Sequence, residues 1–162
     1  MGERVHGGAA RIDAALGMIA VRIEHVGSTA VPGLAAKPII DIQISVERMH
    51  PRDRFVDPLE GLGYEFVPDP TDTEHEYFKK EIEGVRRHQI HVCPVGSEWE
   101  RRHLAFRDHL RAHPDDAARY AELKRRLAAE HPNDILSYID AKEPFVREIE
   151  ARSLNAERVG GS

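Results

Sequence analysis

Two stretches with the alternation typical of β-strands flank a loop rich in glycine and proline near the N-terminus. In residues 39–46, Ile40, Ile42 and Ile44 fall on one face of a strand and polar residues fall on the other. Residues 18–26 alternate in the same way before the loop begins. Because the isoleucine face must be covered, these strands have to join a sheet, and this requirement limits the fold more than any other feature.

The other hydrophobic patterns predict a small mixed sheet followed by a group of helices. Helices are expected over 9–16 and 51–62, strands over 64–67, 76–82 and 86–92, and about three further helices after Ser97, Pro114 and Asn133. Glu83-Gly84 favours a hairpin turn. Pro144 is expected to kink or split the last helix because proline lacks a backbone donor. The predicted fold class is therefore α/β (α+β).

Length and composition indicate a single soluble domain. The 162 residues suffice for one compact core, expected over 9–152 with flexible tails at 1–8 and 153–162. No apolar run approaches the roughly 20 residues that span a bilayer, so no membrane association is expected. The single Cys93 cannot form an internal disulfide, which favours a cytoplasmic location. The net charge of −5 argues against nucleic acid as a partner.

The loop after the first strand opens with Gly27-Ser28-Thr29, a sequence that suits phosphate binding. Glycine lets the backbone approach a phosphate closely, exposed amides donate hydrogen bonds, and the hydroxyl groups can bind a phosphate oxygen or a metal ion. An ordinary turn between two strands has the same composition. The motif by itself leaves both interpretations open.

Asp41 is an acid in the middle of an apolar strand, where a carboxylate needs a partner or a function. Binding of Mg²⁺ together with substrate phosphates is one such function. An ion pair with Lys37 or with an arginine is the alternative. Lys37 itself precedes a proline, which restricts it to an extended conformation, and it could contact a phosphate, neutralise Asp41 or be solvated.

The predicted strand 86–92 carries polar side chains on both faces, which is unusual for a strand that only packs. One face holds Arg87, Gln89 and His91, and the other holds Arg86, His88 and Ile90. Next to Asp41, His91 could bind a metal ion or carry a proton. His88 and His91 lie on opposite faces, so they do not form a zinc site by themselves.

A basic cluster follows on the first C-terminal helix. It consists of Arg101, Arg102, His103, Arg107, His109, Arg111 and His113. Such a cluster is most often a solvated helix face, and a ligand-binding role for part of it is the alternative.

Several of these segments together resemble the GrpB family. The resemblance rests on residues 23–34 and 37–42, and it extends to 88–92, 97–108 and 120–128. It covers most of the chain from about Ile12 to Ile149. The family usually opens with a longer, aromatic-rich segment, and the short start before Ile12 departs from that pattern.

The family is placed in the polymerase-β-type nucleotidyltransferase superfamily, so the resemblance implies a nucleotidyltransferase-like mixed β-sheet flanked by helices. The signature of that superfamily is a Gly-Ser turn, then a strand with two acids one residue apart, and a third acid on a later strand. Gly27-Ser28 and Asp41 match it. Gln43 stands in place of the second acid, and His91 stands where the third is expected.

The function implied by the resemblance is binding of a nucleoside triphosphate with Mg²⁺ by a possible transferase that has an incomplete acid set. Asp41 and His91 are then the catalytic candidates, and Asp41 and Gln43 the metal ligands. Contacts to the nucleotide are expected from His25, Gly27, Ser28, Thr29, Lys37, Arg86, Arg87 and His88.

Two alternatives use the same fold differently. Some family members are fused to dephospho-coenzyme A kinase, which implies a non-catalytic interaction or folding-assistance module with that kinase as partner. A transition-metal protein that uses His25 and His91 is the other alternative.

Overall fold

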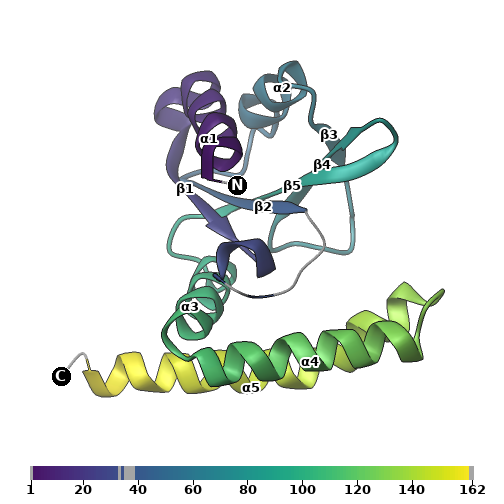
Figure 1. The fold of residues 1–162 in the computed structure, drawn as a ribbon. Coiled ribbons are helices and arrows are strands. Elements are labelled where there is room, and N and C mark those ends of the chain that lie inside the picture. Colours follow the sequence, from purple (N-terminus) through teal and green to yellow (C-terminus); the bar gives the residue numbers. More distant parts are fainter. Residues whose placement is uncertain (1, 33, 35–38, 161–162) are drawn as a thin grey trace.

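The computed structural model describes residues 2–32, 34 and 39–160. In this part of the chain a five-stranded sheet lies among five α-helices (Figure 1). The strands are β1 (Ala20–Val26), β2 (Ile40–Val46), β3 (Glu65–Val67), β4 (Glu76–Ile82) and β5 (Val85–Pro94). The helices are α1 (Gly2–Leu16), α2 (Asp53–Gly61), α3 (Glu98–Ala112), α4 (Pro114–Glu130) and α5 (Ile135–Gly160). The mixed α/β class expected from the sequence is confirmed.

The sheet is mixed because one of its pairings is parallel. Its strand order is β1-β2-β5-β4-β3, in which β2 pairs with β5 in parallel and every other neighbour is antiparallel. The expected hairpin joins β4 to β5, and both of its turn residues, Glu83 and Gly84, have positive φ. The central β2 and β5 therefore lie side by side although they are far apart in the sequence.

The isoleucine face of β2 forms the main core. Ile42 and Ile90 are in register on β2 and β5, and both pack with Phe78 of β4. The helices α1 and α2 cover this face and contribute Ile12 and Phe55, which are fully buried. The alternation in the sequence thus predicted correctly which residues of β2 face the core.

The three C-terminal helices lie on the opposite side of the sheet, with α4 and α5 side by side below α3 (Figure 1). A second apolar cluster holds them together and includes Leu110 of α3, Tyr120 of α4 and Ile149 of α5. Val31, from the loop after β1, belongs to the same cluster. The loop that follows β1 is therefore anchored on the C-terminal helices.

The N-terminal boundaries differ from the sequence prediction. The first helix begins at Gly2, so residues 2–8 are helical rather than loose. Residues 17–19 form a short 3-10 helix, and β1 begins at Ala20 instead of Met18. Gly17 has φ +55, a conformation that ends the helix and redirects the chain into the strand.

The last helix also differs from the prediction at both ends. Its N-cap is Asp134 rather than Asn133, because the Asp134 carboxylate accepts hydrogen bonds from the Ser137 amide and hydroxyl. The helix then runs as one element through Pro144 to Gly160 and includes residues 153–160, which were expected to be flexible. Packing against α3 and α4 offsets the backbone hydrogen bond that proline cannot make.

In the described ranges, we find no helix with both the length and the apolar character required to cross a membrane.

Candidate functional site

Asp41 and His91 meet on the face of the sheet that is turned away from the main core. They come from the paired strands β2 and β5, where Gln43 is the register partner of His91. His91 Nε2 lies 3.5 Å from Asp41 Oδ1, and the two side chains are 20% and 24% exposed. The pair is therefore sheltered by the protein but still open to a ligand.

The turn that follows β1 closes directly against this carboxylate. Gly27 has φ +78, and a Cβ atom added to it would lie 2.5 Å from Asp41 Oδ2. Glycine is therefore required at position 27 for two reasons: the backbone there is left-handed, and it approaches Asp41 too closely for a side chain. The Ala30 amide donates a hydrogen bond to the Gly27 carbonyl at 3.1 Å and closes the turn.

His25 and Thr29 bridge the two ends of the loop. The Thr29 hydroxyl donates to the Ile39 carbonyl at 3.3 Å, which leaves its oxygen to accept a hydrogen bond from His25 Nε2 at 2.8 Å. Burial lowers the pKa of His25, and the positive charge of Arg111 lowers it further. His25 is thus a neutral donor that connects β1 to the start of β2.

Two arginines of the basic cluster on α3 hold the same loop from the other side. Arg107 donates to the Glu24 carboxylate at 2.9 Å and to the His25 carbonyl at 3.1 Å. Arg111 Nε donates to the Ala30 carbonyl at 2.7 Å. Part of the cluster is therefore not a freely solvated face, because Arg107 and Arg111 support the loop beside Asp41.

Lys142 of α5 also belongs to this region, although no sequence motif indicated it. Its side chain is half-buried, and its Nζ lies 5.2 Å from the centre of the Tyr138 ring. Burial lowers the pKa of Lys142, and the negative charge of Asp41 partly opposes that effect. In the described residues, no carboxylate lies within 4.0 Å of this ammonium group.

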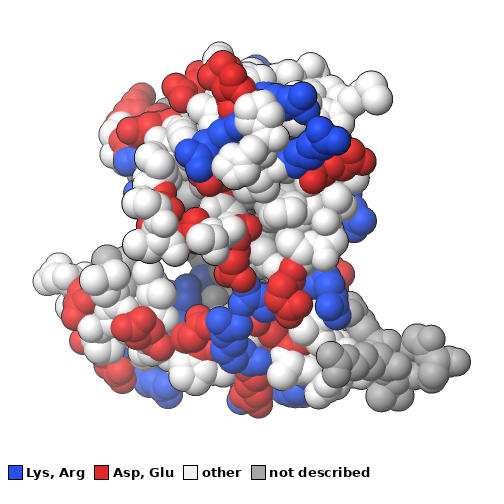
Figure 2. Space-filling view, turned by 180° about the vertical axis from the view of Figure 1, so that it is seen from behind, with Lys and Arg blue, Asp and Glu red and all other residues white. Residues whose placement is uncertain are grey.

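A hollow separates the two layers that carry these groups. Figure 2 shows the surface indented between the part that holds the sheet and the helices α4 and α5, with Lys and Arg side chains at the indentation. We call the residues gathered around this carboxylate the Asp41 cleft, defined by Gly27 and His91, which lie against Asp41, and by Lys142, whose charge interacts with that of Asp41. It joins a carboxylate, a histidine and a weakly compensated ammonium group.

Next to His91, a stack of rings closes one side of the cleft. His75 lies on Trp99 with ring centres 3.7 Å apart, and Trp99 lies on His103 at 3.9 Å. The ring centre of His75 lies 5.2 Å from that of His91, and His75 Nδ1 lies 2.7 Å from Asp72 Oδ2. Burial lowers the pKa of His103 to about 4. No motif in the sequence indicated this stack, because His75 lies in a loop, Trp99 and His103 lie in α3, and the adjacent His91 lies in β5.

The other predicted site residues are distributed as follows. Gln43 is only 1% exposed, and neither polar atom of its amide has a hydrogen-bond partner among the described residues. Near the start of β5, Arg86 is exposed and Arg87 is half-buried. His88 lies opposite Ile40 on the core face, away from Asp41, with its ring 6.4 Å from that of Tyr64. Lys37 and the Ser28 side chain lie outside the described parts.

The donor set limits which metal ions fit. Within the described ranges, no three or more His, Cys, Asp or Glu side chains converge to hold a metal ion. Asp41 supplies one carboxylate, and Gln43 is buried beneath the surface. A pair of Mg²⁺ ions therefore lacks ligands, whereas one Mg²⁺ that arrives already bound to phosphate oxygens fits a single carboxylate.

This chain is similar to a described protein family and to several known proteins. The model of the family described as "GrpB protein" matches residues 3–152. A solved structure titled conserved protein GrpB from Enterococcus faecalis has a TM-score of 0.85 and 35% identity, covering 95% of this chain and 92% of that one. A UPF0157 protein of Pseudomonas aeruginosa is 46% identical over 150 residues, which is 91% of this chain and 61% of the relative.

Other relatives are considerably longer than this chain. The UPF0157 protein YqkA of Bacillus subtilis is 38% identical, and the match covers 86% of this chain but only 40% of YqkA. A protein named dephospho-CoA kinase from Mycolicibacterium paratuberculosis is 34% identical over 167 residues, which is 88% of this chain and 41% of that protein. The chain thus spans less than two thirds of the length of each of these relatives and of the Pseudomonas aeruginosa protein.

Proposed function

The chain belongs to the GrpB family, and from this premise we propose that it binds a nucleoside triphosphate with one Mg²⁺ ion in the Asp41 cleft. The observation that carries the proposal is that the Gly27 turn closes against the Asp41 carboxylate, while the charge of Lys142 interacts with that of the same carboxylate. A turn against a carboxylate, with a lysine in the same region that has no close acid, suits a ligand that brings both negative charge and a cation.

Each group has a distinct part in this proposal. Asp41 takes the Mg²⁺ ion that the phosphates carry, because carboxylates and phosphate oxygens together satisfy that ion. The backbone of the Gly27 turn approaches the phosphates closely. Lys142 offsets the remaining negative charge from α5. His25, Thr29, Arg107 and Arg111 keep the loop in position without touching the ligand.

The residues favour binding of the nucleotide without efficient nucleotidyl transfer. Transfer by the two-metal route needs acids that hold two cations on the attacking and leaving oxygens. Gln43 carries no charge and is buried, and His91 is a poor ligand for Mg²⁺. The proposed protein is therefore a nucleotidyltransferase-like binder.

Calorimetry tests this proposal directly. ATP, GTP, CTP and UTP are titrated into the chain with and without Mg²⁺, and into Asp41→Ala. The matched control is Asp57→Ala, which removes an exposed carboxylate from α2. We expect Mg²⁺-dependent binding that Asp41→Ala weakens at least about tenfold and Asp57→Ala leaves unchanged. If no triphosphate binds, or if Asp41→Ala binds as the wild type does, the proposal fails.

A second candidate is a non-catalytic module that assists dephospho-coenzyme A kinase. The relatives from Mycolicibacterium paratuberculosis and Mycobacterium leprae that carry this kinase name are both 34% identical to the chain. The chain matches about 40% of each of them, which is consistent with one module of a longer protein. Sedimentation of the chain mixed with the kinase from the same organism checks this idea, and two independent boundaries at micromolar concentration would exclude it.

A further inference from the structure

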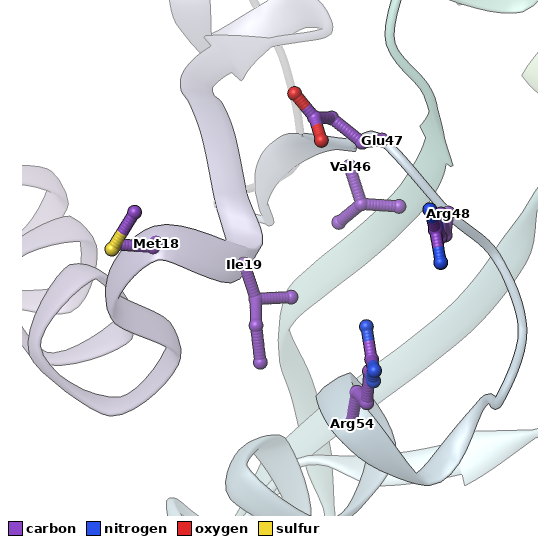
Figure 3. A pocket seen from close by; sticks show the side chains of 6 residues that line it. All are labelled: Met18, Ile19, Val46, Glu47, Arg48 and Arg54. Carbon is purple, nitrogen blue, oxygen red and sulfur yellow. The ribbon is translucent and has the colours of Figure 1, made fainter.

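A separate cavity of about 300 Å³ lies at the opposite end of β2 from Asp41. It is lined by Met18, Ile19, Val46, Glu47, Arg48 and Arg54 (Figure 3). Val46 is the last residue of β2, and a strand rises about 3.3 Å per residue, so the cavity is about 17 Å from Asp41. It is independent of the Asp41 cleft and of the function proposed for that cleft.

The two arginines of this cavity face the same space without an acid between them. Figure 3 shows the side chains of Arg48 and Arg54 extending toward each other, whereas Glu47 points away from both. Among the described residues, no carboxylate lies within 4.0 Å of either guanidinium group. Two like charges that share a space repel each other, so a bound anion would stabilise this arrangement.

A nearby arginine shows the contrast. Arg52 lies two residues before Arg54 and pairs with Glu76 of β4 at 3.5 Å. The chain thus provides an acid for Arg52 and none for Arg48 or Arg54.

The other side of the cavity is apolar. Met18 is completely exposed, and Ile19 packs at the edge of the main core. A fully exposed methionine beside a partly buried isoleucine offers contact to an aliphatic group. The lining therefore has one end with two arginines, from which Glu47 points away, and another end that is apolar.

From this arrangement we propose that the cavity binds a phosphate monoester whose remaining part is apolar. A phosphate monoester carries nearly two negative charges at neutral pH and matches two guanidinium groups, whereas a carboxylate matches only one. The apolar part lies against Met18 and Ile19. The ligand class is thus an aliphatic phosphate, distinct from the nucleotide proposed for the Asp41 cleft.

Amide-resolved NMR titration with butyl phosphate tests the proposal. We expect saturable shifts of the amides of residues 46–48 and 54, with affinity at least about tenfold weaker in Arg48→Ala and Arg54→Ala. The matched control is Arg125→Ala, which removes an exposed guanidinium from α4 that pairs only with Glu122 of the same helix, and its affinity should equal that of the wild type. Equal weakening in Arg125→Ala, or shifts near Asp41 alone, would overturn the proposal.

Two further titrants separate the contribution of the phosphate group from that of the apolar part. Butanoate should bind at least about tenfold more weakly than butyl phosphate, because it carries one charge. Inorganic phosphate should also bind more weakly than butyl phosphate. In Met18→Ser the affinities of the two ligands should become nearly equal, because this variant lacks the apolar contact. Butanoate binding as tightly as butyl phosphate would contradict the phosphate assignment. Unchanged selectivity in Met18→Ser would contradict the apolar contact.

Discussion

His91 Nε2 lies 3.5 Å from Asp41 Oδ1, across the parallel pairing of β5 with β2. This contact joins two segments that belong to separate sequence motifs. Gly27 packs against the other oxygen of the same carboxylate, so Asp41 is bounded on one side by a turn and on the other by a histidine. The geometry around Asp41 is therefore sensitive to small changes in either neighbour.

Gly27→Ala should disturb Asp41 in a way that an equivalent change elsewhere does not. Gly27 and Gly84 have φ +78 and +79, so alanine at either position costs about 1–2 kcal/mol of stability. A Cβ at position 27 additionally collides with Asp41 Oδ2, whereas one at position 84 meets nothing within 4 Å. Chemical denaturation should show a larger loss for Gly27→Ala, and equal losses would refute the close approach.

Lys142→Met should separate a binding role from a structural role. A half-buried ammonium without a nearby carboxylate costs free energy in the folded state, as the lowered pKa of Lys142 indicates. The variant should therefore melt at the same temperature or higher. Calorimetry should show its affinity for Mg²⁺-ATP reduced about tenfold.

The charge-preserving variant Lys142→Arg serves as the control for that experiment and should retain most of the affinity. Reduced affinity together with a lower melting temperature in Lys142→Met would indicate instead that the lysine supports the fold.

Stability should fall as the pH drops from about 6.5 to about 4, in part because of His103. The folded-state pKa of His103 is lowered to about 4 by burial, whereas an unfolded histidine titrates near 6.5. The unfolded state therefore binds more protons in this window, and His103 removes up to about 3 kcal/mol of stability across it. Above pH 6.5 this loss is absent.

Urea unfolding at pH 7, 6 and 5 measures the effect. His103→Gln keeps a donor for the Trp99 carbonyl, which His103 Nδ1 contacts at 2.8 Å, but it does not titrate. Its stability should decline less steeply with falling pH than that of the wild type. Some decline should remain, because the pKa values of His25 and His75 are also lowered by burial. Identical slopes would show that His103 is not the group responsible.

Arg111→Gln should raise the pKa of His25. After burial, the charge of Arg111 is the strongest influence that lowers this pKa, so removing it favours the protonated ring. The titration of the His25 ring protons, followed by NMR, should move to higher pH. Arg126→Gln, which removes an exposed charge from α4, should leave it unchanged, and equal shifts in both variants would point to a general charge effect.

The fold was largely predictable because it depends on local patterns. Alternation in 39–46 identified the core face of β2, the Glu83-Gly84 pair identified the hairpin, and α3 begins directly after Ser97, as expected. The prediction that Pro144 would kink or split its helix was wrong about a split, because packing on neighbouring helices sustains α5. Helix ends were the least predictable feature, since caps depend on which of several polar residues finds a donor.

Within the candidate site, the sequence indicated the residues near Asp41 but not their surroundings. Asp41, Gly27 and His91 were identified, and the structure brings them together. His88 was expected to contact the nucleotide as part of the function implied by the resemblance, although the register with β2 turns it to the core face. Lys142 had no signal at all, because its importance comes from proximity to Asp41 rather than from any motif.

The sequence by itself determined the mixed sheet and the strand that carries Asp41, because hydrophobic periodicity and turn residues act over short distances. The family was indicated separately, by the resemblance of several segments to the GrpB family. Only the tertiary structure decided that the charge of Lys142 interacts with that of Asp41 and that Arg48 and Arg54 line one cavity. These relationships depend on how helices dock on the sheet, and docking is set by the packing of side chains from distant parts of the chain.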